Sequence, residues 1–167
     1  MAVVNTKATA ITNADASTQT NSSMRISGGS VKESLGTVEA ANGDSIASVY
    51  RFARVKSGDR VSRVLLSSDA ITSAAGDIGL YDTAANGAAA VDADFFGSAV
   101  SLASAQVNTD VTHESGVFGV EDVEQPLWQA LGLSADPGKL YDVAVTLTAA
   151  AAAAGTISLK VQFIGGN

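Results

Sequence analysis

The side chains that could carry out chemistry in this chain are few. The sequence of 167 residues has a single histidine, His113, which is followed by Glu114, and it has no cysteine. A Ser-His-Asp relay needs a nucleophile, a base and an orienting acid in one place, and no nucleophile-elbow motif occurs. No glycine-rich run continues into the Gly-Lys-Ser/Thr of a phosphate-binding loop. The sequence therefore predicts a protein that has no catalytic residue and is not an enzyme.

Closely spaced carboxylates are the second group that could bind a ligand. Asp92 and Asp94 are two residues apart, and Glu121, Asp122 and Glu124 form another group. Oxygen ligands of this kind suit Ca²⁺, but neither group has the glycine turn and terminal glutamate of a calcium loop. Without cysteine there is no thiolate ligand either. We expect no metal site and no cofactor.

The elements that would position such side chains are clearest near the C-terminus. Apolar residues occupy every second position of 141–147 and of 157–163, a pattern that predicts two strands with one apolar face each. We expect these strands to form a hairpin around the alanine-rich segment 148–155. The residues expected to face the core are Tyr141, Val143, Val145, Leu147, Ile157, Leu159, Val161 and Phe163.

Short strands and turns continue through the rest of the chain. Residues 48–55 and 60–67 flank the turn Ser57-Gly58-Asp59 and predict a second hairpin. Pro126 and Gly132 bracket one short helix. Many short strands with a single helix exclude a parallel α/β fold. The sequence predicts an all-β protein, a jelly-roll-like antiparallel β-sandwich with one short helix.

The N-terminal residues differ in composition from the rest. Between Asn5 and Ser30, 14 of 26 residues are Ser, Thr, Asn or Gln, and no aromatic residue precedes Tyr50. Such a segment buries too little apolar area to order itself. We expect residues 1–34 to form an extended polar arm and residues 35–167 a single β-sandwich domain. The arm is either a passive tail or a segment that lies on a partner through its isolated apolar residues, which are Val3, Val4, Ile11, Met24 and Ile26.

Charge is unevenly distributed. The formal net charge of −7 argues against binding to nucleic acid and to anionic membranes. No apolar run reaches the roughly 18–20 residues that span a bilayer. Residues 64–138 contain no Lys or Arg but eleven Asp and Glu. Just before them is a basic block, interrupted only by Asp59, that consists of Arg51, Arg54, Lys56, Arg60 and Arg63. These charges are either ordinary solvated groups or complementary patches that orient copies of the protein on each other or on a partner.

Four segments of the chain resemble a known family. They are VYRFARVKSGDRV at 49–61, DIGLYDT at 77–83, PLWQALGL at 126–133 and YDVA at 141–144. Across about residues 35–164 the chain resembles the head cement, or decoration, proteins of tailed bacteriophages. The resemblance implies a jelly-roll-like sandwich, often a homo-dimer or homo-trimer, that binds the major capsid protein outside an icosahedral shell and ties neighbouring capsomers together. It also implies a place on the capsid exterior in the virion, after assembly in the host cytoplasm.

Two other functions compete with this interpretation. A carbohydrate-binding β-sandwich, such as a phage adhesin, would stack exposed aromatic rings on sugars. The chain offers one Trp and three Tyr, most of them in patterns that predict burial. An enzyme built on a β-sandwich is disfavoured by the missing nucleophile and base. For the cement function, the residues expected at a partner interface are Val3, Val4, Ile11, Met24, Ile26, Arg51, Arg54, Arg60 and Arg63.

Overall fold

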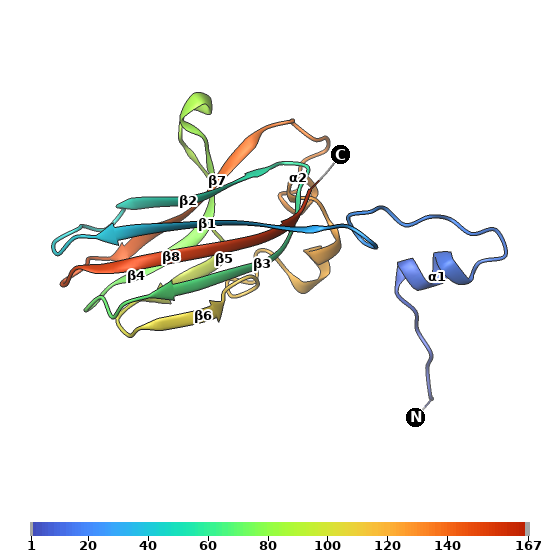
Figure 1. The fold of residues 1–167 in the computed structure, drawn as a ribbon, viewed down its shortest axis with the longest axis horizontal. Coiled ribbons are helices and arrows are strands. Elements are labelled where there is room, and N and C mark those ends of the chain that lie inside the picture. The colour runs from blue at the N-terminus through green and yellow to red at the C-terminus, as the bar shows by residue number, and fades with distance from the viewer. Residues whose placement is uncertain (1, 166–167) are drawn as a thin grey trace.

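The fold is known from a computed structural model that describes residues 2–165, and it is a sandwich of two antiparallel sheets with an N-terminal segment projecting from one end (Figure 1). Sheet A has the strand order β1-β8-β3-β6, and sheet B has the order β2-β7-β4-β5. The strands are β1 (Val31–Ala40), β2 (Val49–Lys56), β3 (Arg60–Ser68), β4 (Ala75–Asp82), β5 (Ala90–Ser101), β6 (Gln106–Asp110), β7 (Leu140–Ala149) and β8 (Gly155–Ile164). The helical segments are α1 (Thr9–Asp15), η1 (Ala84–Asn86), η2 (Val120–Glu124) and α2 (Leu127–Ala130).

The predicted fold class is confirmed. Most consecutive strands lie in opposite sheets, and every strand pair is antiparallel, as in a jelly-roll-like β-sandwich. The core between the sheets contains an aromatic cluster of Phe95, Phe96 and Phe118, whose ring centroids lie 5.0–5.5 Å apart. All three rings are buried.

The alternating segments form strands as predicted, but neither predicted hairpin exists. β2 pairs with β7 in sheet B, whereas β3 pairs with β8 and β6 in sheet A. β7 and β8 likewise belong to different sheets. A strand with one apolar face can bury it equally well against a neighbour across a sandwich, so the pattern fixes the face and leaves the pairing open. The segments expected to be hairpin loops are therefore crossovers between sheets.

Seven of the eight residues predicted to face the core from β7 and β8 are at most 2% exposed. Phe163 is the exception, because it is only partly buried and packs against the rim of the core. At this end of β8, the buried side chain is Ile164. Phe163 therefore faces the core as predicted, but it is less deeply buried than the other seven residues.

The turn between β2 and β3 holds the short helix in place. The backbone N–H of Leu127 donates to the carbonyl of Asp59, and the N–H of Trp128 donates to the carbonyl of Ser57, at 2.9 and 3.0 Å. Leu127 is buried and Trp128 is partly exposed. α2 begins at Leu127, one residue after Pro126, which was predicted to be its first residue, and it spans only four residues. Its core contact is thus made by Leu127, with the tryptophan at the edge.

The two sides of the sandwich are closed differently. On one side β1 lies against β2, and a Cβ on Gly36 would collide with the carbonyl oxygen of Phe52, so only glycine allows this approach. On the other side the segment after β6 covers the edge of β5. The N–H groups of Ser115 and Phe118 donate to the carbonyls of Phe96 and Phe95, at 3.0 and 3.1 Å.

β1 changes the boundary expected for the arm. The strand begins at Val31 and pairs with β8 without a register shift, so residues 31–34 belong to sheet A. The segment before it also contains the helix α1 and is not extended throughout. Within residues 2–165, no helix is long and apolar enough to cross a membrane.

Candidate interaction surfaces

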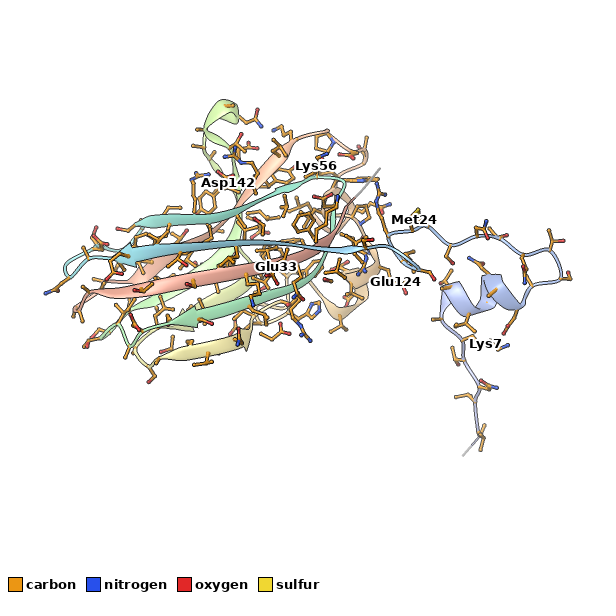
Figure 2. All side chains as sticks on the ribbon, in the orientation of Figure 1. Lys7, Met24, Glu33, Lys56, Glu124 and Asp142 are labelled. Atoms are coloured by element: carbon orange, nitrogen blue, oxygen red, sulfur yellow. The ribbon has the colours of Figure 1, made fainter. Side chains whose placement is uncertain are left out.

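The segment before the sandwich stands apart from it. Every hydrogen bond of residues 2–22 stays within the segment, including the 2.7 Å ion pair between Lys7 and Asp15. We call these residues the outer arm, and Figure 2 shows Lys7 well away from the sheets. The five apolar residues predicted for a partner interface are all exposed: Val3 by 101%, Val4 by 80%, Met24 by 66%, Ile11 by 52% and Ile26 by 38%. A segment with this exposure gains little from its own fold, so a covering surface must come from outside it.

The outer arm is joined to the sandwich at Arg25. The Nε of Arg60 donates to the carbonyl of Arg25 at 2.5 Å, and Gly29 packs against the side chain of Ile164. The Arg25 side chain lies near Asp136, whose pKa is held below its usual value mainly by a hydrogen bond from Ser57, then by one from the N–H of Gly138 and by the charge of Arg25. Residues 25–29 are thus fixed on the end of the sandwich, and the outer arm that precedes them can extend towards a partner.

Arg51 and Arg54 meet at one carboxylate on the outer face of sheet B. Asp142 accepts from Arg51 at 3.0 Å and from Arg54 at 2.7 Å, and only 8% of its side chain is exposed. Burial alone would raise the pKa of Asp142, but the hydrogen bonds and charges of the two guanidinium groups hold it below its usual value. Two cations share one anion, so this cluster retains an excess positive charge, and 55% of the Arg54 side chain is exposed.

Arg51 has a second role in the fold. Its guanidinium donates to the carbonyls of Asp82 and Ala88, both at 2.9 Å, and lies 5.1 Å from the ring centroid of Tyr81. These contacts tie the β4–β5 loop to β2 and bury the outward-facing Tyr81. The arginine therefore stabilises the loop, and Arg54 is the more accessible member of the pair.

The other two arginines predicted for the interface lie elsewhere. Arg60 is partly buried and donates to the carbonyls of Arg25 and Val123, so it holds the arm and η2 against the body. Burial lowers its pKa. Arg63 pairs with Asp110 at 3.2 Å, between β3 and β6 of sheet A. The basic block of the sequence is thus divided among three places, and only Arg51 and Arg54 form one cluster.

Carboxylates gather near β5 without cationic partners. Asp77 accepts from the N–H of Ala99, and Glu114 accepts from the N–H of Ser98, both at 2.7 Å. Asp92 and Asp94 lie side by side, and burial together with the neighbouring Asp94 raises the pKa of Asp92. No ion pair within residues 2–165 includes any of these four carboxylates. Nothing in the sequence pattern indicated that Asp77 and Glu114 would accept from neighbouring N–H groups of β5, because they come from different segments.

The remaining candidates for chemistry are engaged structurally. His113 stacks on Phe118 at 5.2 Å, and its Nδ1 lies 2.9 Å from the carbonyl oxygen of Phe118. Asp122 accepts from the N–H of Gly119 at 3.0 Å, at the start of η2. In the described part of the chain, no three His, Cys, Asp or Glu side chains are grouped as ligands of one metal ion.

The similarity of this chain to known proteins lies in its fold. No family model matches the sequence, and no curated protein matches it significantly. A chain of the cyanophage Pam1 capsid asymmetric unit is similar, with 18% identity and a TM-score of 0.51. A chain of the capsid of Ralstonia phage GP4 is similar with 14% identity and a TM-score of 0.55. Each alignment covers 83% of this chain and 86% of the other. At these identities the likeness shows a shared fold.

Proposed function

We propose that this protein is a structural, non-enzymatic component of a phage virion that binds the outer surface of the capsid and clamps neighbouring capsomers. The observation that carries the proposal is the likeness in fold, over most of the chain, to chains from two phage capsids. The sequence resemblance to cement proteins supports the same role independently. Its partner would be the major capsid protein, and the two would assemble in the host cytoplasm.

The two parts of the molecule suit the two tasks of a clamp. The sandwich has a continuous buried core of its own. The outer arm exposes apolar side chains that its own body does not cover. An arm that orders on docking loses conformational entropy at that step and gains contact area in return. The arm would therefore supply attachment, and the sandwich would span the seam between capsomers.

The physical effect on the shell is a mass-action effect. A protein that binds the closed shell better than free subunits stabilises the closed shell against the outward load of packaged DNA. Many copies on one lattice gain avidity without strong individual contacts. A clamp of this kind needs no catalytic group, which agrees with the structural use of His113 and Asp122 described above.

The test is binding to capsids assembled without this protein. We expect the full chain to saturate such heads and to raise the temperature at which they release DNA. A chain that starts at Ser23 should fold normally but occupy heads at least tenfold more weakly. The variant Val3→Ser/Val4→Ser/Ile11→Ser tests the apolar contacts alone, and Ile46→Ser/Val107→Ser, on exposed positions of the sandwich, is its control.

The outcomes separate the parts of the proposal. Failure of the full chain to bind heads would refute the function. Full occupancy by the chain that starts at Ser23 would leave the function standing and remove the arm from it. Equal losses for the arm variant and its control would indicate that attachment is spread over the surface of the sandwich.

A further inference from the structure

The charges of the sandwich are separated onto opposite edges of its sheets. β1 and β2 are the edge strands on one side, and β6 and β5 are the edge strands on the other. The basic side chains Lys32, Arg51, Arg54 and Lys56 belong to β1 and β2, and we call them the basic flank; β1 also carries the exposed carboxylates Glu33 and Glu39. The acidic flank consists of Asp77, Asp92, Asp94 and Glu114, on β4, on β5 and just after β6.

The basic flank keeps part of its charge unneutralised. Arg51 and Arg54 share the single carboxylate of Asp142. Lys32 and Lys56 are exposed and form no ion pair within residues 2–165. Figure 2 shows Lys56 and Asp142 on the same side of the sandwich, by β2 and β7. Against its four cations stand the carboxylates of Glu33, Glu39 and Asp142, so this edge keeps a small excess of positive charge on a protein whose net charge is −7.

The acidic flank is the electrostatic complement. Its four carboxylates receive backbone N–H groups or lie beside one another, and none contacts a cation within the described chain. Residues 64–138, which include all four, contain no Lys or Arg that could supply one. Carboxylates placed together without an internal partner repel each other, so a cationic surface from outside would stabilise them.

Each flank also exposes apolar side chains beside its charges. Val49 is 40% exposed at the start of β2. Val91 and Val117 are 39% and 46% exposed on β5 and on the segment that covers its edge. A contact between the flanks would thus combine complementary charge with burial of apolar surface, as protein interfaces do.

From this arrangement we infer that copies of this chain associate head to tail, with the basic flank of one copy against the acidic flank of the next. A two-fold axis would instead place like patches together, basic on basic, because the two flanks lie on opposite edges. Head-to-tail contacts either close into a ring or continue as a filament, and a closed ring fits a component of a finite shell. The outer arm projects from one end of the sandwich, so its exposed apolar residues stay available in the ring (Figure 1).

The inference concerns the free protein and does not depend on capsid binding, so the two can fail separately. Sedimentation velocity on the purified full-length chain measures it directly. We expect association that weakens at least tenfold between about 0.1 M and 1 M salt, where the Debye length falls from about 10 Å to about 3 Å. A chain that stays monomeric at every salt concentration, or one whose association strengthens with salt, overturns the inference.

Charge reversal identifies the surfaces. Lys32→Glu/Lys56→Glu and Asp94→Lys/Glu114→Lys should each weaken self-association by tenfold or more, because each places like charges across the contact. Mixing the two double variants should restore association, since each retains the flank that matches the other. Joining all four substitutions in one chain should restore it as well.

The matched control reverses two other lysines by the same formal charge. Lys7→Glu/Lys160→Glu alters the outer arm and β8 of sheet A, outside both flanks, and should leave association nearly unchanged. An equal loss in this control would show that net charge alone governs association and would overturn the inference. The inference is also overturned if the flank variants associate normally and lose only occupancy on capsids, since the flanks would then contact the shell.

Discussion

The sandwich and the outer arm both contain large aliphatic residues and place them in opposite environments. Val143 and Leu159 are fully buried between the sheets, whereas Val3 and Val4 are almost fully exposed. Apolar residues in the sandwich recur at every second position and share a face, so burying one brings the others with it. In the outer arm they are separated by polar residues. The comparison shows that a part of the chain folds alone where its apolar residues are numerous and share a face, and the outer arm has neither property.

The largest expected effect lies in the aromatic core. Phe96→Ala removes a ring that is 0% exposed and contacts both Phe95 and Phe118. Such truncations cost about 3–5 kcal/mol. Each kcal/mol lowers the Tm of a chain of this size by about 2–4 °C. Thermal unfolding should therefore show a fall of about 6–20 °C, while Ile11→Ala in the outer arm should leave the Tm unchanged. Similar losses for both would remove the distinction between the regions.

A smaller effect is expected at the carboxylate shared by Arg51 and Arg54. Asp142→Asn leaves two guanidinium groups without their anion, and because Arg54 is half exposed we expect a loss of about 1–2 kcal/mol. The pKa of Asp142 is lowered in the folded state, so its contribution is present above the ordinary pKa of about 4 and is lost as the pH falls through the lowered value. In urea unfolding, the variant should have a lower free energy of unfolding than the unmodified protein at pH 7, and this difference should be smaller near pH 2. A deficit that is independent of pH would assign the loss to packing.

Ionisation of Asp92 should have the opposite effect on stability from ionisation of Asp142. Burial and the neighbouring Asp94 raise its pKa in the folded state, so its ionised form destabilises the fold as the pH rises above about 4 and through the raised value. Asp92→Asn should therefore raise the Tm at pH 7, by no more than about 2–4 °C, and change it little at pH 3. Asp15→Asn, in the outer arm, should change neither. A fall in the Tm of Asp92→Asn at pH 7 would mean that the carboxylate has a stabilising partner.

How far the sequence predicted this molecule depends on the kind of information involved. Alternation identified the inward faces of β7 and β8, because the side-chain period of a strand is local. The partners of β2 and β3 could not be read in this way. Strand pairing in a sandwich depends on segments far apart in the chain, and short turns can join strands in opposite sheets. Phe163 continued the alternation correctly but lies where the core ends, which a periodic pattern does not reveal.

The candidate surfaces follow the same rule. An arm over residues 1–34 was predicted from composition alone, and Val3, Val4 and Ile11 within it are exposed. The separation of charge along the chain was visible too. Its three-dimensional form was not, because Arg60 and Arg63 lie away from Arg51, and Glu114 joins the acidic flank through a loop. Whether these residues contact a partner stays a prediction.

The smallest expected effect belongs to removal of the outer arm. A chain that starts at Ser23 keeps Arg25 and the whole of β1, and it loses only residues whose hydrogen bonds stay within the arm. Its Tm and its urea unfolding midpoint should equal those of the full chain within error. A chain that starts at Ser34 is the sharper comparison, because it also loses Val31, Lys32 and Glu33 from the pairing of β1 with β8. That chain should be measurably less stable, which would place the boundary between the two regions after Ser23 and before Ser34. If the chain that starts at Ser23 is also less stable than the full chain, the outer arm packs on the sandwich.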